Sequence, residues 1–428
     1  MGCASCRAWA RLWAGNGFPW SRGLVRCPNG SRIPLRLRSG VCLSAVQKKT
    51  SFNPRILLMT TMENIVPNDT LFYHILPSLP AKSLGRFKCV CKQWRSFLAT
   101  PMFTKMHLHH VNTQNHHKQL IVSTIKLCKY FRTIDCETPE VGLSAYCSLP
   151  FEANHNQMKI ISSLNGLVCI QIDSFDPRIS MDRYLNLILW NPLTGDYKRL
   201  PKDNSYVNDF RIPARGYGLY YSCCDDDYKL LRLTIYKNVF IYSLKSDTWR
   251  KVEPRRCPLS LYWMSSCLLN ENLYFLELSI NNMNVRSYSI IRFDTNTEKF
   301  TEIAAPSLQH VDICCFSLTV LSGCVYLCAS SKVSSWDKLA LWKMDGDREW
   351  TKVVSCCGRL SKRGFYQPLH VMKNGNWLVG SRRKGCFYEV NLEMKTTKEV
   401  CAYTPTPTDG PMDVLGGGKF VETIVSLN

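Results

Sequence analysis

The first 62 residues contain no aspartate or glutamate, although they carry ten lysines and arginines. This segment therefore supplies nearly half of the formal net charge of +21. An arginine-rich, acid-free start is typical of organellar transit peptides, and the Met-Gly start suits acylation, although Cys6 stands where myristoylation requires Ser or Thr. We expect a basic, disordered leader at 1–62, or a start at Met59 or Met62. A transit peptide and a lipidated end are the alternatives.

The sequence also lacks a long apolar run. No stretch of about eighteen apolar residues without charge occurs, so we expect no membrane-spanning helix. The 22 cysteines lack the paired CxxC spacing of a zinc site, because Cys3 and Cys6 stand alone. Adjacent cysteine pairs lie in apolar, strand-like text at 223–224, 314–315 and 356–357. We expect reduced thiols that pack as small apolar side chains, as in the cytoplasm or nucleus.

Motifs of catalysis are missing as well. The glycines before Lys419 lack the spacing of a phosphate-binding loop, and no G-x-S-x-G elbow occurs. A histidine cluster has no accompanying ligand motif, so we expect a solvated linker there: His107, His109, His110, His116 and His117. We expect Asp225–Asp227 at a loop tip, and the basic clusters at 359–363 and 382–384 in solvated loops. The sequence thus predicts no cofactor, no metal site and no enzymatic activity.

Residues 65–108 carry two apolar stripes at helical spacing. Pro67 with the following Asn and Asp suits a helix start, and Pro77 must end or kink that helix just before it. The stripes comprise Leu71, Ile75, Leu76 and Leu79, and then Leu84, Phe87, Val90, Cys91, Trp94, Phe97 and Leu98. Roughly 45 residues are few for a self-sufficient core. The stripes therefore predict a bound partner or a docked second domain, with an ordinary helical hairpin as the alternative.

The order of residues in this segment resembles the F-box of the large plant family of F-box proteins with an associated C-terminal domain. The run LPAKSLGRFKCVCKQWRSFLATPMFTKMHL carries the match, and Gly85 departs from a usual leucine. The resemblance implies a small three-helix F-box at 63–108, a linker at 109–117, and docking to a Skp-type adaptor that is linked to cullin. The adaptor-binding residues that it implies are Pro67, Leu71, Ile75, Leu76, Leu79, Pro80, Leu84 and Trp94.

A layout of strand end, polar turn and anchor residue recurs through the long C-terminal part. The anchors, about fifty residues apart, are Tyr197, Trp249, Phe300, Trp350 and Thr397. Hairpin-like turns follow the same period at Asn165-Gly166, Glu271-Asn272, Ser322-Gly323 and Asn374-Gly375. This period predicts propeller blades of about four strands, as in kelch repeats. Residues 118–428 then form an all-β propeller of about six blades, with five or seven as the alternatives. We expect the tryptophans to pack the blades: Trp190, Trp249, Trp342 and Trp350.

The same region resembles the kelch-like F-box-associated domain of that family, through LNGLVCI, LILWNPLTGDYKRLP, IYSLKSDTWRKV and GGGKFVETIVSLN. The resemblance implies an α+β multidomain protein that acts as the substrate-recognition subunit of a Skp–cullin–F-box ubiquitin ligase. Its propeller would bind a target protein in the cytoplasm or nucleus, without a membrane or nucleic-acid partner. A ligand-binding or enzymatic propeller protein, and an organelle-targeted basic scaffold, are the alternatives.

Overall fold

A computed structural model describes residues 69–113 and most of 118–427. The gaps in the second range are 123–129, 143–146, 151–156, 175–183, 202–213, 235–237, 253–261, 281–285, 307–312, 334–335, 347–348, 357–365, 382–385, 395 and 403–418. Of the predicted leader, only the antiparallel strands β1 (Gly23–Arg26) and β2 (Arg32–Leu35) lie within the described residues. The chain divides into two compact units, residues 76–86 with 98–428, and residues 1–75 with 87–97.

Short helices fill residues 70–113. They are the π-type helix η2 (Thr70–Ile75), the 3₁₀ turn η3 (Leu76–Ser78), α3 (Ala81–Phe87), α4 (Lys92–Leu98) and α5 (Pro101–Thr113). The helix type changes just before Pro77, as predicted from the missing proline N–H.

The second apolar stripe does not form one helix, because α3 ends before residue 88 and α4 begins at residue 92. The Cys91 sulfur accepts a hydrogen bond from the Trp94 amide at 3.5 Å, which helps to start α4. Similarly, the Thr100 hydroxyl accepts from the Phe103 amide at 3.2 Å and caps α5. Helix α5 then continues to Thr113, across the predicted boundary between F-box and linker.

Five antiparallel sheets are each built from four strands that are consecutive in sequence. Blade 1 comprises β6 (Gln157–Leu164), β7 (Leu167–Ser174), β8 (Tyr184–Trp190) and β9 (Tyr197–Arg199). Blade 2 comprises β10 (Ala214–Ser222), β11 (Asp227–Thr234), β12 (Val239–Ser243) and β13 (Thr248–Val252). Blade 3 comprises β14 (Tyr262–Leu269), β15 (Asn272–Ile280), β16 (Arg286–Asp294) and β17 (Lys299–Ala304).

Blade 4 comprises β18 (Ile313–Leu321), β19 (Cys324–Val333), β20 (Trp336–Asp345) and β21 (Glu349–Cys356). Blade 5 comprises β22 (Tyr366–Val371), β23 (Trp377–Ser381), β24 (Cys386–Asn391) and β25 (Thr396–Ala402). Because each blade is a four-stranded meander, its first-to-second and third-to-fourth turns lie at the same end of the strands. We call that end of the propeller the tight-turn face.

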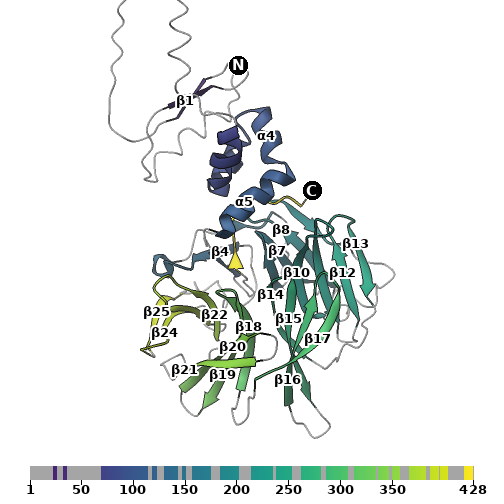
Figure 1. The fold of residues 1–428 in the computed structure, drawn as a ribbon, viewed down its shortest axis with the longest axis vertical. Helices are drawn as coiled ribbons and strands as arrows, with labels where there is room; N and C mark the ends of the chain where they lie inside the picture. Colours follow the sequence, from purple (N-terminus) through teal and green to yellow (C-terminus); the bar gives the residue numbers. More distant parts are fainter. Residues whose placement is uncertain are drawn as a thin grey trace, which may run out of the picture. The chain divides into compact units, whose positions relative to one another are not determined.

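A sixth sheet, blade 6, combines strands from the two ends of the propeller. It comprises β26 (Lys419–Phe420), β3 (Lys118–Val122), β4 (Tyr130–Asp135) and β5 (Cys147–Ser148), and the short helix η4 (Pro139–Val141) follows β4 in sequence. Phe420 lies opposite Lys118 in this sheet. The six four-stranded sheets confirm the predicted propeller of about six blades (Figure 1).

The apolar cores lie between neighbouring blades. Separate clusters join blades 1 and 2, 2 and 3, 3 and 4, and 4 and 5. Ile134 of blade 6 packs with Phe387 of blade 5, and Phe420 of blade 6 packs with Trp190 of blade 1. Burial of each such large side chain stabilises the fold by about 1.5–3 kcal/mol. Side-chain packing between blades therefore closes the ring together with the strand pairing within blade 6.

The predicted hairpin turns join the first and second strands of their blades. Asn165 and Gly166 have φ of 53° and 82°, and Ser322 and Gly323 have φ of 46° and 72°. Positive φ at both positions is what a two-residue hairpin of type I′ requires. In blade 3 the turn is Asn270–Glu271, one residue earlier than predicted. Blade 2 has a four-residue turn, 223–226. The predicted series of two-residue hairpin turns therefore has no member in this blade.

The sequence did not reveal that the first strand of blades 1 to 5 carries a register shift. These shifts lie at Ile160/Ser162, Ala214/Gly216, Trp263/Ser266, Ile313/Cys315 and Pro368/His370. A bulge redirects side chains, and two serines near the shifts, in blades 1 and 3, both bond to blade 2. The Ser162 hydroxyl accepts from the Leu219 amide at 3.1 Å, and the Ser266 hydroxyl donates to the Tyr217 carbonyl at 2.7 Å.

Candidate functional site

Helix η2 combines a buried aromatic anchor with exposed apolar side chains. The Phe72 ring lies 4.6 Å from the Phe97 ring and 6.3 Å from the Trp94 ring, both edge-on. Edge-to-face contacts add to the stabilisation from burial alone. Beside Phe72, Tyr73 and Ile75 keep 42% and 37% of their surface exposed. This helix therefore presents apolar surface to solvent while its anchor holds it in place.

Helix α5 packs against η3 and carries a buried histidine. The His107 ring is fully buried and its Nε2 donates to the Leu79 carbonyl at 3.2 Å. Its Nδ1 is buried with no hydrogen-bond partner among the described residues. Burial lowers the pKa of His107, against a smaller raising effect of the Leu79 bond. The neutral imidazole thus fixes α5 to the chain before α3, with Phe103 fully buried beside it.

The structure separates the eight predicted adaptor-binding residues by exposure. Leu76 and Leu84 are buried, at 1% and 0% exposed, within the helical residues 70–113, which we call the helical module. Leu71, Leu79 and Trp94 are half-buried, whereas Ile75 and Pro80 are exposed; Pro67 lies outside the described residues. Tyr73 was not among the predicted residues, although it stands next to the apolar stripe and is exposed. Which of them contact an adaptor stays a prediction.

The propeller anchors found in the sequence connect neighbouring blades. The Trp249 indole N–H donates to the Pro201 carbonyl at 3.0 Å, next to the last strand of blade 1. In the same way the Trp350 indole N–H of blade 4 donates to Ala304, which ends blade 3, at 2.9 Å. Trp190 and Trp342 are buried in clusters between blades. These contacts confirm the predicted packing role of the four tryptophans.

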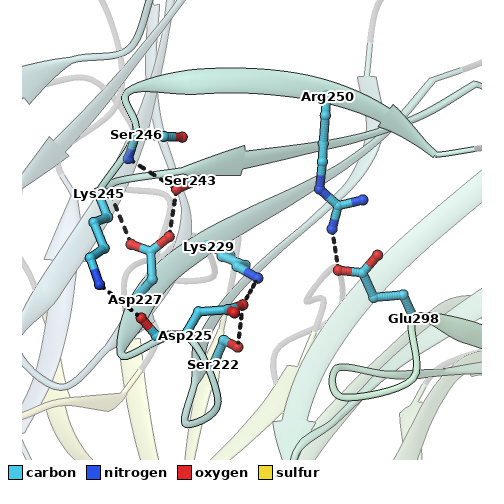
Figure 2. Close-up of polar contacts among 9 residues, drawn as sticks. All are labelled: Ser222, Asp225, Asp227, Lys229, Ser243, Lys245, Ser246, Arg250 and Glu298. Carbon is cyan, nitrogen blue, oxygen red and sulfur yellow. Dashed lines mark hydrogen bonds and ion pairs between the residues drawn. The ribbon is translucent and has the colours of Figure 1, made fainter.

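Charged groups brace the tight-turn face at blade 2 (Figure 2). Asp225 bonds to Lys229 and accepts from the Ser222 hydroxyl, whose oxygen lies 2.9 Å away. Asp227 accepts from the Ser243 hydroxyl at 2.6 Å and from the Lys245 amide at 2.9 Å.

These bonds determine the character of the turn. The Lys229 hydrogen bond holds the pKa of Asp225 below its usual 3.8, so this side chain is an anion at neutral pH. Asp225 and Asp226 lie in the turn, as predicted for a loop tip, while Asp227 begins β11.

Some of the residues considered in the sequence as candidates for chemistry lie within the described part of the chain. Within the described part of the chain no group of three or more His, Cys, Asp or Glu residues could hold a metal ion. His109 and His110 lie on helix α5 rather than in a linker, whereas His116, His117 and the two basic clusters lie outside the described residues. Cys223 and Cys224 lie in an exposed turn rather than in a strand. No helix among the described residues has the length and apolarity needed to cross a membrane.

Comparison with protein-family models identifies both parts of the chain. A model described as "F-box domain" matches residues 68–106, and one described as "F-box associated beta propeller domain" matches residues 149–406. The second match covers more than half of the chain and contains blades 1 to 5.

Known proteins of Arabidopsis thaliana are similar over most of the chain. An F-box/kelch-repeat protein is 25% identical over 337 residues, which cover 73% of this chain and 85% of that protein. F-box protein ETP2 is 26% identical, with 76% and 83% covered, and F-box protein CPR1 is 25% identical, with 72% and 76% covered. Among solved structures, that of YjhT aligns with a TM-score of 0.41 and 8% identity over 63% of this chain and 91% of that one.

Proposed function

Because the chain belongs to the family of F-box proteins with an F-box associated β-propeller domain, we propose that it is the substrate-recognition subunit of a Skp–cullin–F-box ubiquitin ligase. The observation that carries this proposal is the presence of both family domains, in this order, on one chain. The helical module docks a Skp-type adaptor, and the propeller holds a target protein. We place this activity in the cytoplasm or nucleus, where ubiquitin ligases of this type find their targets.

The proposed role needs no catalytic group on this chain. A receptor that binds adaptor and target together raises the effective concentration of target lysines near the ubiquitin carrier. The rate of ubiquitin transfer then depends on how long the target is held and in what orientation. The closed ring of blades suits this role, since rigid sheets position the connecting loops that bind partners.

The proposed adaptor surface is the exposed apolar side of the helical module. Tyr73 and Ile75 are its centre, because both are large apolar side chains that helix η2 leaves exposed to solvent. Leu71 and Trp94 are half-buried and belong to the same compact unit as Tyr73 and Ile75. Of the residues predicted from the sequence, the proposed surface thus uses exposed Ile75 with half-buried Leu71 and Trp94.

A pull-down with a Skp-type adaptor tests the proposal. We expect wild type to bind, and Tyr73→Asp with Ile75→Asp to lose at least tenfold in affinity, since charge replaces apolar contact. Tyr197→Asp with Met394→Asp is the matched control, because both side chains are exposed on the propeller, at 41% and 73%. Failure of wild type to bind would reject the adaptor role. Equal binding by the first variant would reject the assigned surface alone.

A further inference from the structure

Two lysines of helices α3 and α5 are held by carboxylates of the propeller, and we propose that these four are positioning residues that fix the direction of α3 and α5 on the propeller. Lys105 of α5 lies 2.9 Å from Asp226, and Lys82 of α3 lies 3.1 Å from Glu422. This inference rests on the proposed receptor function, because a fixed direction matters only if the module carries an adaptor and the propeller a target. All four residues belong to one compact unit of the chain.

Asp226 is a prepared acceptor. It lies in the tight turn of blade 2 with φ of 53°, a left-handed conformation in which aspartate is tolerated. The Tyr221 hydroxyl donates to it, and the Tyr221 bond and the Lys105 bond together lower the pKa of Asp226. On either side, Asp225 and Asp227 are bonded within blade 2, as Figure 2 shows. The carboxylate is therefore charged and held before any lysine approaches.

Glu422 is held in a different way. Its two neighbours in the C-terminal segment, Val421 and Thr423, are buried at 7% and 0% exposed. The Thr423 hydroxyl donates to the Asn165 carbonyl at 2.7 Å, and the Asn191 amide donates to the Thr423 carbonyl at 3.1 Å. Glu422 thus projects from a backbone that blade 1 holds at the next residue, Thr423, and its side chain keeps 21% exposure.

The lysines also belong to one body. Helix α5 packs on η3 through the His107 bond to the Leu79 carbonyl, and η3 leads into α3. Leu84 of α3 and Phe103 of α5 are both fully buried. A turn of blade 2 and the segment along blade 1 therefore hold one rigid group of helices at two points, which opposes rotation about either one.

The strength of the two ion pairs decides how firmly α3 and α5 are held on the propeller. The lysine side chains are 62% and 56% exposed, and exposed ion pairs are individually weak. Since each pair is weak by itself, the proposed orientation of α3 and α5 depends on both. The screening length of salt water falls to about 3 Å at 1 M salt. The two ion pairs therefore weaken at high ionic strength, and α3 and α5 are held less firmly.

Single-molecule energy transfer on the full chain bound to a Skp-type adaptor tests this inference. Dyes are placed through unnatural amino acids at Ala99 and Lys299, both exposed. We expect one narrow peak for wild type in low salt and at least a twofold broader one for Lys82→Glu with Lys105→Glu. Adding Glu422→Lys and Asp226→Lys should restore the narrow peak, and 1 M salt should broaden the wild-type peak.

Controls separate this inference from the receptor proposal. Lys343→Glu breaks an ion pair within blade 4, 2.9 Å long, and should leave the peak narrow. An unchanged peak in the double lysine variant, or one that the reciprocal changes do not narrow, would overturn the inference. Loss of adaptor binding in wild type would instead reject the receptor function, and it is read in the same experiment.

Discussion

At the scale of single residues, the role of a side chain follows from its burial more than from its residue type. Leu76 and Ile75 are neighbours on one apolar stripe, yet one is 1% and the other 37% exposed. Periodicity places both on one helical face, but the helices packed around that face decide which one is covered. His107 shows the same limit, since its sequence context suggested a solvated cluster and the fold buries it completely.

The buried His107 predicts acid sensitivity of the helical module. Because burial lowers its pKa below the usual 6.5, the folded protein binds this proton less tightly than the unfolded chain does. The stability it contributes is complete above pH 6.5 and is lost as the pH falls below that value. Chemical denaturation at the two pH values should show a lower free energy of unfolding for wild type at pH 5.5 than at pH 7.5.

His107→Gln is the informative variant for this loss, because its amide can still donate to the Leu79 carbonyl but cannot gain a proton. Its stability should change less between the two pH values than that of wild type. The exposed His109 and half-buried His110 remain in both proteins as an internal control. The same acid loss in the variant would show that other groups cause it.

At the scale of elements, turns and strands were the features that the sequence predicted best. Tight hairpin turns need left-handed backbone, which Asn and Gly adopt readily, so the spacing of Asn-Gly and Ser-Gly pairs marks the hairpins. The bulges in the first strands escaped prediction because no residue type signals them. The break between α3 and α4 was also missed, since a stripe at helical spacing continued through the turn at 88–91.

The turn of blade 1 should tolerate no side chain at Gly166. A Cβ there would lie 2.2 Å from the Thr423 hydroxyl and 2.8 Å from the Val421 carbonyl, with φ of 82°. Gly166→Ala should therefore cost about 2–4 kcal/mol of unfolding free energy, from overpacking and left-handed strain together. Gly375→Ala is the matched control, with the same φ and nothing within 4 Å, and should cost about 1 kcal/mol. Urea denaturation measures both, and equal losses would contradict the steric argument.

At the scale of the whole molecule, the sequence predicted a ring but not how it closes. The period of about fifty residues located blades 1 to 5, each local in sequence. Blade 6 pairs Phe420 with Lys118, and no local pattern reports a contact between segments so far apart. The ion pairs of Lys82 and Lys105 were missed for the same reason.

Removal of residues 421–428 should destabilise the whole propeller while leaving β26 in place. The deletion takes away Ile424, Val425 and Leu427, which are 3–6% exposed. At about 1.5–3 kcal/mol for each buried aliphatic side chain, the loss is about 5 kcal/mol or more, a large part of typical domain stability. Thermal unfolding should show it, and deletion of Asn428 alone should have no such effect. If the truncated protein unfolded at the same temperature as wild type, residues 421–428 would not contribute to the stability of the propeller.

The two-ended construction of blade 6 has a consequence for synthesis on the ribosome. Strands β3 to β5 emerge early, but their sheet lacks its innermost member until residues 419–420 have been made. Until then the nascent propeller carries unpaired strand edges and the uncovered apolar faces of blades 1 and 5, which favour association with other chains. The helices of residues 70–113 are made before any of the blades, and the hydrogen bond that joins η3 to α5 spans only 28 residues. If the chain acts as the proposed receptor, a ribosome that stalls within the last blades would leave a chain able to capture an adaptor but unable to hold a target.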